Sequence, residues 1–196
     1  MFSVRLSTRF ALALFLVDGV ASAQTLSTVR TPPELGPAAG PVLDQQLTSL
    51  EREFVPAAEA MPEAKFNFAP TGGEFKGVKT FAQQVRHVAS ANYQFAAGIA
   101  GEKAPADLGG EDGPETLKTK AEIIAYLKGS FTYAHRAFAG IRTANATAAM
   151  PSPWGQGTTS RLALAAHTLT HASDHYGQMA VYLRLNGIIP PASRKQ

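Results

Sequence analysis

Hydrophobic residues recur three or four positions apart in four long stretches of the chain, and this is the spacing of one face of an α-helix. The stretches predict helices over residues 42–55, 78–99, 119–143 and 158–186. In the third stretch the spacing alternates between three and four, which is typical of the seam between packed helices; its positions are Ile124, Leu127, Phe131, Ala134, Phe138 and Ile141. No stretch shows the polar–apolar alternation of a run of strands. The pattern therefore predicts an all-α fold, a single four-helix bundle.

Proline and glycine separate the predicted helices. Three prolines and a Gly-Gly pair lie between residues 56 and 73, and the first of them, Pro56, is expected to end the first helix. Residues 101–114 and 150–157 also combine glycine with proline, so they predict two further loops. Asn186-Gly187 is a suitable end for the last helix, because glycine readily adopts the left-handed conformation that follows a helix.

Residues 1–23 have the pattern of a secretory signal peptide and not of a folded element. Arg5 and Arg9 precede an apolar run, residues 10–17, which is shorter than the roughly 20 residues needed to cross a bilayer. Ala21-Ser22-Ala23 then supplies the small residues that a signal peptidase requires, so cleavage is predicted after Ala23. The mature protein is therefore expected to be periplasmic or secreted.

Composition narrows the chemistry of the 196-residue chain. A Pro- and Gly-rich linker over residues 24–41 follows the signal peptide, which leaves residues 42–192 for the bundle. With 45% hydrophobic and 17% charged residues the chain can bury a core. The absence of cysteine excludes disulfides, Cys-ligated zinc, iron–sulfur clusters and covalently attached haem. The formal charge of +3 is small and scattered, so we expect no nucleic-acid partner, and no membrane contact once the signal peptide is removed.

Histidine is the residue type that points to a site. His171 and His175 are four residues apart in the last predicted helix, so both imidazoles lie on one helix face and can reach one metal ion. Alanine follows His171 in place of the glutamate of an H-E-x-x-H protease motif, which argues against that enzyme class. A third ligand must come from another helix. Periodicity does not choose between His87 and His135, and each taken alone is better explained as a partly buried histidine that hydrogen-bonds an acceptor.

Two segments resemble a known family. Residues 171–193, HASDHYGQMAVYLRLNGIIPPAS, resemble the last helix of the DinB-like (DinB/YfiT) superfamily of four-helix metal proteins, which typically reads H-x-x-x-H-x-G-Q and continues into L-R-x-x-G. The matching positions are His171, His175, Gly177, Gln178, Leu183, Arg184 and Gly187. Residues 80–92, TFAQQVRHVASAN, are similar to the region that carries the first ligand histidine of that family. The resemblance thus implies a DinB-like bundle with a metal ion held by His87, His171 and His175.

Other polar residues near this motif keep more than one interpretation. His167 lies one turn before His171, and it is an outer group of the site, an alternate ligand or an ordinary polar residue. Asp174 orients an imidazole or is a solvated helix charge, and Gln178 is placed to form a hydrogen bond near the site.

Three imidazoles favour a divalent transition metal over magnesium or calcium, which prefer oxygen ligands. Zinc or nickel is expected, and iron stays open. Three protein ligands leave a coordination position for water or substrate, which is typical of a catalytic zinc site. Characterised members of the superfamily include thiol-dependent transferases and isomerases. Predicted export argues against a small cytosolic thiol as the substrate, so the sequence favours metal-dependent hydrolysis. A transferase is the other enzyme class that stays open. The sequence identifies no general base.

A non-catalytic protein is the alternative. Exported four-helix bundles also bind haem between Met and His, and Met61, Met150 and Met179 are available. A histidine pair on one helix suits a single metal ion better than haem, whose axial ligands approach from opposite faces. A bundle that binds a metal only for stability or sequestration also stays open. The expected partner is a small-molecule substrate that the sequence does not identify, and a homodimer is left open.

Overall fold

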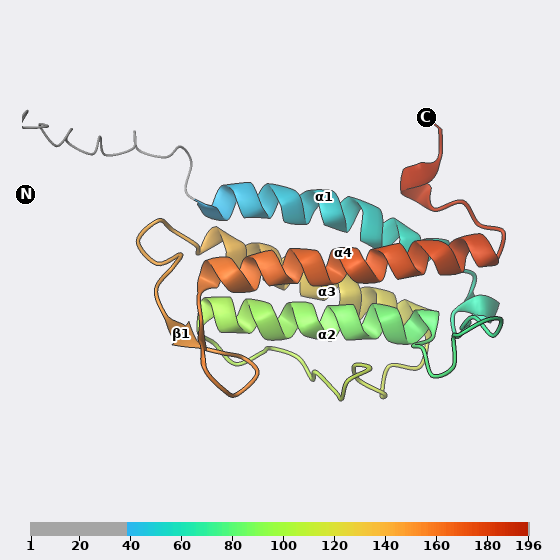
Figure 1. Cartoon of the computed structure of the whole chain (residues 1–196), viewed down its shortest axis with the longest axis horizontal. Coiled ribbons are helices and arrows are strands. Elements are labelled where there is room, and N and C mark those ends of the chain that lie inside the picture. The colour runs from blue at the N-terminus through green and yellow to red at the C-terminus, as the bar shows by residue number, and fades with distance from the viewer. Residues whose placement is uncertain (1–38, 196) are drawn as a thin grey trace, which may run out of the picture. The chain divides into compact units, whose positions relative to one another are not determined.

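The computed structural model describes residues 39–195, and this part of the chain forms four α-helices (Figure 1). They are α1 (Ala39–Ala60), α2 (Phe81–Ala100), α3 (Lys120–Ala139) and α4 (Arg161–Leu185), with short 3-10 helices η1 (Glu63–Lys65) and η2 (Pro191–Ser193). The predicted all-α four-helix bundle is confirmed. The predicted signal peptide and most of the predicted linker lie outside the described residues. Within the described residues, no helix has the length and apolar character needed to cross a membrane.

The helices begin where side chains satisfy the free N–H groups of their first turns. Thr80 and Gln83 form a reciprocal capping box at the start of α2, and Thr119 and Glu122 form the same motif at the start of α3. The Ser160 hydroxyl accepts from the third residue of α4. Hydroxyl and Gln or Glu side chains at these positions therefore set the three boundaries.

The predicted bounds of the first and third helices differ most from the structure. The first helix was expected over residues 42–55, but α1 runs from Ala39 to Ala60 and contains Pro56. Proline inside a helix costs about 3 kcal/mol or more, but buried residues on both sides of Pro56 favour a continuous helix. The third helix was expected to reach residue 143, but α3 ends at Ala139, although Ile141 beyond it is still 1% exposed. The hydrophobic pattern thus continued past the helix because the following turn also packs into the core.

The four helices pack around one apolar core. Helix α2 lies against α3 and α4, and α1 lies against the same two helices on the other side, so α2 and α4 are direct neighbours (Figure 1). The largest fully buried apolar side chains are Leu47, Phe54, Met61, Phe81, Leu127, Phe131, Phe138, Ile141, Leu164, Met179 and Leu183. This arrangement places one face of α2 opposite one face of α4.

The two long loops that connect α2 to α3 and α3 to α4 lie outside the four helices. The loop before α4 contains a short hairpin, in which β1 (Met150–Pro151) pairs antiparallel with β2 (Thr158–Thr159). Its strands have two residues each, which is too few to produce an alternating pattern in the sequence. The loop between α2 and α3 runs back along α2. It is held there by Arg86, whose guanidinium donates to the main-chain oxygens of Pro114 and Leu117 at 3.3 and 3.4 Å.

Candidate metal centre

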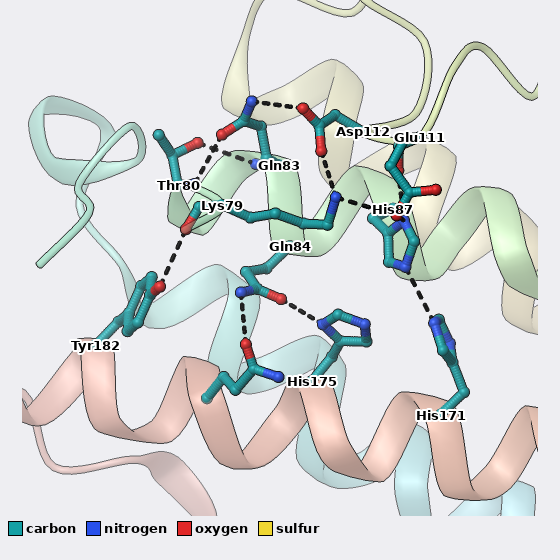
Figure 2. A network of polar contacts seen from close by, with 11 residues as sticks. Lys79, Thr80, Gln83, Gln84, His87, Glu111, Asp112, His171, His175 and Tyr182 are labelled. Atoms are coloured by element: carbon teal, nitrogen blue, oxygen red, sulfur yellow. Dashed lines mark hydrogen bonds and ion pairs between the residues drawn. The ribbon is translucent and has the colours of Figure 1, made fainter. Parts of the chain in front are cut away.

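His87 of α2 faces His171 and His175 of α4 across the contact between the two helices (Figure 2). One ring nitrogen from each histidine lies within 4.8 Å of the others. The Nε2 atoms of His87 and His171 are 3.0 Å apart, and the three ring centroids are separated by 4.6 to 5.0 Å. Three imidazoles therefore converge on one small volume.

A main-chain carbonyl orients His87. Its Nδ1 lies within hydrogen-bond distance of the main-chain oxygen of Glu111. A carbonyl oxygen only accepts, so Nδ1 carries the proton and the lone pair of Nε2 is directed toward the other two histidines. The Lys79 ammonium contacts the Asp112 carboxylate at 2.5 Å, and Gln83 Nε2 donates to the same carboxylate at 2.8 Å. These contacts hold the loop that presents the carbonyl (Figure 2).

Burial keeps the two histidines of α4 neutral. It lowers the pKa of His171 to about 3, with a further contribution from the neighbouring histidines. It lowers the pKa of His175 to about 4, with a further contribution from His87. Both rings are therefore uncharged at pH 7 and carry a free lone pair, which is the form that binds a metal ion.

The geometry fits a transition-metal ion. Tetrahedral zinc with bonds of about 2.0–2.1 Å separates two ligand nitrogens by about 3.3 Å. The 3.0 Å contact between the Nε2 atoms of His87 and His171 is within a few tenths of that value. Because His87 Nε2 carries a lone pair, this contact is a hydrogen bond only when His171 Nε2 carries a proton. His171 Nδ1 is buried and has no hydrogen-bond partner among the described residues. A cation between the rings would accept both Nε2 lone pairs, so the three histidines could hold one.

The structure separates His87 from the other candidate, His135. The His135 ring lies between α3 and α1, where Nδ1 is 2.6 Å from Asp44 Oδ1 and Nε2 is 3.1 Å from Glu51 Oε2. The two ring nitrogens are therefore both occupied by carboxylates. His167 is exposed and is not part of the cluster; its ring packs against Phe95 and Trp154 with centroid distances of 4.9 and 5.2 Å.

A cavity of about 240 Å³ adjoins His87 between α2 and the loop that precedes α3. Ser90 and Gln94 line it from α2, and Glu111 lines it from the loop. Glu111 is a residue that sequence reasoning missed. It lies in an irregular Gly-rich loop without periodicity, and only the path of that loop brings its carboxylate to 3.7 Å from His87 Nδ1.

A comparison with protein families agrees with this architecture. The family model described as the DinB superfamily matches residues 46–179. The chain belongs to the DinB superfamily. The matched range includes all three histidines of the cluster and most of the bundle in this DinB-superfamily protein. No curated protein matches the chain.

Proposed function

We propose that this DinB-superfamily protein is an exported metal-dependent hydrolase, whose divalent transition metal is held by His87, His171 and His175. Zinc or nickel fits an all-imidazole ligand set, and iron is the next candidate. The single observation that carries the proposal is the convergence of three imidazoles, two of them kept neutral by burial. When bound, such a metal lowers the pKa of a coordinated water to about 7 and polarises a carbonyl group.

The cavity beside His87 is the proposed substrate site, and its own residues orient the substrate. The Tyr126 hydroxyl donates to the main-chain oxygen of Asp107 at 2.7 Å, so the Ser90 hydroxyl, 3.1 Å away, donates to Tyr126. The lone pairs of Ser90 then remain free to accept a hydrogen bond from substrate. Among the described residues that line the cavity, Glu111 has the one carboxylate, and we propose that it accepts the proton of the nucleophile.

Metal analysis tests the ligand assignment. Protein purified from the periplasm should contain about one equivalent of zinc, nickel or iron by elemental analysis. The variant His175→Ala should lose most of it, while His135→Ala, which removes a histidine outside the cluster, should keep it. Less than a tenth of an equivalent in the unaltered protein would contradict the site. A Soret band in the visible spectrum would favour the haem-binding alternative instead.

Hydrolysis is tested separately from metal binding. Metal-loaded protein should hydrolyse at least one compound of a chromogenic ester, amide and lactone panel, and a chelator should abolish the activity. The variant Glu111→Gln should keep its metal and lose most of this activity, because the amide cannot accept the proton. If the protein binds its metal and hydrolyses none of the panel, the non-catalytic reading is favoured.

Export is proposed from the pattern of residues 1–23 alone. Expression of the full chain in a bacterial host should place the protein in the periplasmic fraction. Intact mass should correspond to a chain that begins at Gln24. Replacing Ala21 and Ala23 with bulky residues should leave the precursor uncut. A cytoplasmic protein of full mass would contradict this part of the proposal and leave the metal site untouched.

A further inference from the structure

A line of hydrogen bonds connects His175 to a carboxylate that does not touch it. Gln84 Oε1 lies within hydrogen-bond distance of His175 Nδ1, and Gln84 Nε2 donates to Gln178 Oε1 at 2.9 Å. Gln178 Nε2 in turn donates to Asp174 Oδ2 at 3.0 Å. The line thus begins on α4, crosses to α2 at Gln84 and returns to α4 at His175. Figure 2 shows its last contact, between Gln84 and His175.

The chain of contacts has one direction because it ends on a carboxylate. An ionised carboxylate only accepts hydrogen bonds, so Gln178 must present its NH₂ group to Asp174. Its oxygen then faces Gln84, which must present its own NH₂ group to Gln178. The oxygen of Gln84 is therefore the atom that faces His175. The amide orientations follow from this chemical order, since the shape of an amide does not distinguish its oxygen from its nitrogen.

The direction of the line decides the tautomer of His175. An amide oxygen only accepts, so the imidazole proton must be on Nδ1, and Nε2 is left with its lone pair. If Gln84 were reversed, the proton would move to Nε2, and a protonated nitrogen cannot bind a metal ion. Gln84 is 1% exposed and His175 is 9% exposed, so water does not readily replace either partner.

We propose that Gln84, aligned by Gln178 and Asp174, is a positioning residue that holds His175 in the tautomer with the proton on Nδ1. This tautomer leaves His175 Nε2 free to bind a metal ion, and that role of the nitrogen rests on the proposed function. Asp174 precedes His175 directly and so points about 100° away from it around the helix. Gln178 is one turn later on the same face as Asp174, which is why the carboxylate acts through it.

A neutral amide is suited to this position. A carboxylate in direct contact with His175 would also orient the ring, but it would have to be buried among apolar side chains. It would also favour the imidazolium form, which competes with a metal ion for the same lone pair. Gln84 orients the ring without placing a charge beside it, and the charge of Asp174 stays on the exposed side of α4.

The tautomer is measurable without any metal. In ¹⁵N-labelled, metal-free protein at pH 7.5, long-range proton–nitrogen correlation spectra should show His175 with Nδ1 protonated and Nε2 unprotonated. The variant Gln84→Leu removes the acceptor, and Asp174→Asn removes the anchor at an exposed position that does not endanger folding. Both should increase the population with the proton on Nε2. Gln46→Leu and Glu115→Gln, which make comparable changes at exposed positions outside the line, should leave the spectrum of His175 unchanged.

Metal affinity is the second readout. Removing a partner that orients a ligand typically lowers metal affinity 10–100-fold. Gln84→Leu should lower the affinity for Zn²⁺ by that factor in a competition titration with a chromophoric chelator, and Asp174→Asn should lower it less, in the same direction. Unchanged affinity in both variants, or a wild-type His175 with its proton on Nε2, would overturn the inference. The spectra of metal-free protein keep this outcome distinct from a failure of the proposed function, which would appear as an absence of metal binding in the wild type.

Discussion

At the scale of single residues, Gly113 constrains the backbone of the loop that lies beside the site. Its φ is +75°, a conformation that favours glycine, and an added Cβ would lie 2.8 Å from the backbone of Arg86. Gly113→Ala should therefore lower the free energy of unfolding by about 1–3 kcal/mol, measured by urea denaturation. Gly110→Ala is the matched control, because an added Cβ there meets no atom within 4 Å. Equal stability of the two variants would contradict the strain argument.

The candidate residues divide into those that a sequence can reveal and those that it cannot. His171 and His175 were predicted to act together because a spacing of four fixes their relation within one helix. His87 could not be separated from His135 by spacing, because that choice depends on which helix lies beside α4; only the family resemblance implied His87. Glu111 was missed because the path of an irregular loop brings it to the site.

At the scale of elements, His135 joins α3 to α1. Burial disfavours its charged form, but hydrogen bonds to Asp44 and Glu51 outweigh this effect and raise the pKa above 6.5. A raised pKa means that protonation stabilises the folded state. The contribution is complete below about pH 6.5 and is lost as the pH rises through the higher pKa of the folded protein.

The free energies of unfolding of the wild type and of His135→Gln should therefore approach each other as the pH rises from 5.5 to 9. The wild type should be more stable by about 1–2 kcal/mol at pH 5.5, and the difference should shrink toward pH 9. Urea unfolding at several pH values measures both curves, and subtracting them cancels the titration of the histidines near α4. A difference that grows with pH would have the wrong sign and would contradict the assignment.

The helices also show why element bounds were predicted less well than element number. Pro56 was expected to break the first helix, because local propensity penalises an interior proline. The helix continues through it since Phe54 and Val55 before it, and Ala57 and Ala58 after it, are all buried. That burial depends on α3 and α4, which the sequence of α1 alone does not contain.

At the scale of the whole molecule, the candidate metal centre connects two helices that the chain places far apart in sequence. Any ligand that binds only the folded state stabilises it by mass action, and the gain is about 4 kcal/mol at a concentration 1,000-fold above Kd. Because His87 belongs to α2 and His171 and His175 belong to α4, the ligand set exists only when these helices are packed. Metal binding should therefore stabilise the bundle as a unit.

Thermal unfolding of the metal-free protein gives this prediction a direct measurement. Adding Zn²⁺ or Ni²⁺ in excess should raise Tm by several degrees, while Mg²⁺ should leave it unchanged, because imidazole is a poor ligand for magnesium. His171→Ala should remove the rise, and His167→Ala, one turn earlier on the same helix, should retain it. An equal rise in both variants would mean that the metal stabilises the protein through other groups. A rise confined to the protein with an intact cluster would instead assign the stabilisation to the α2–α4 contact, because no other described trio of histidine or acidic groups lies close enough to bind the ion.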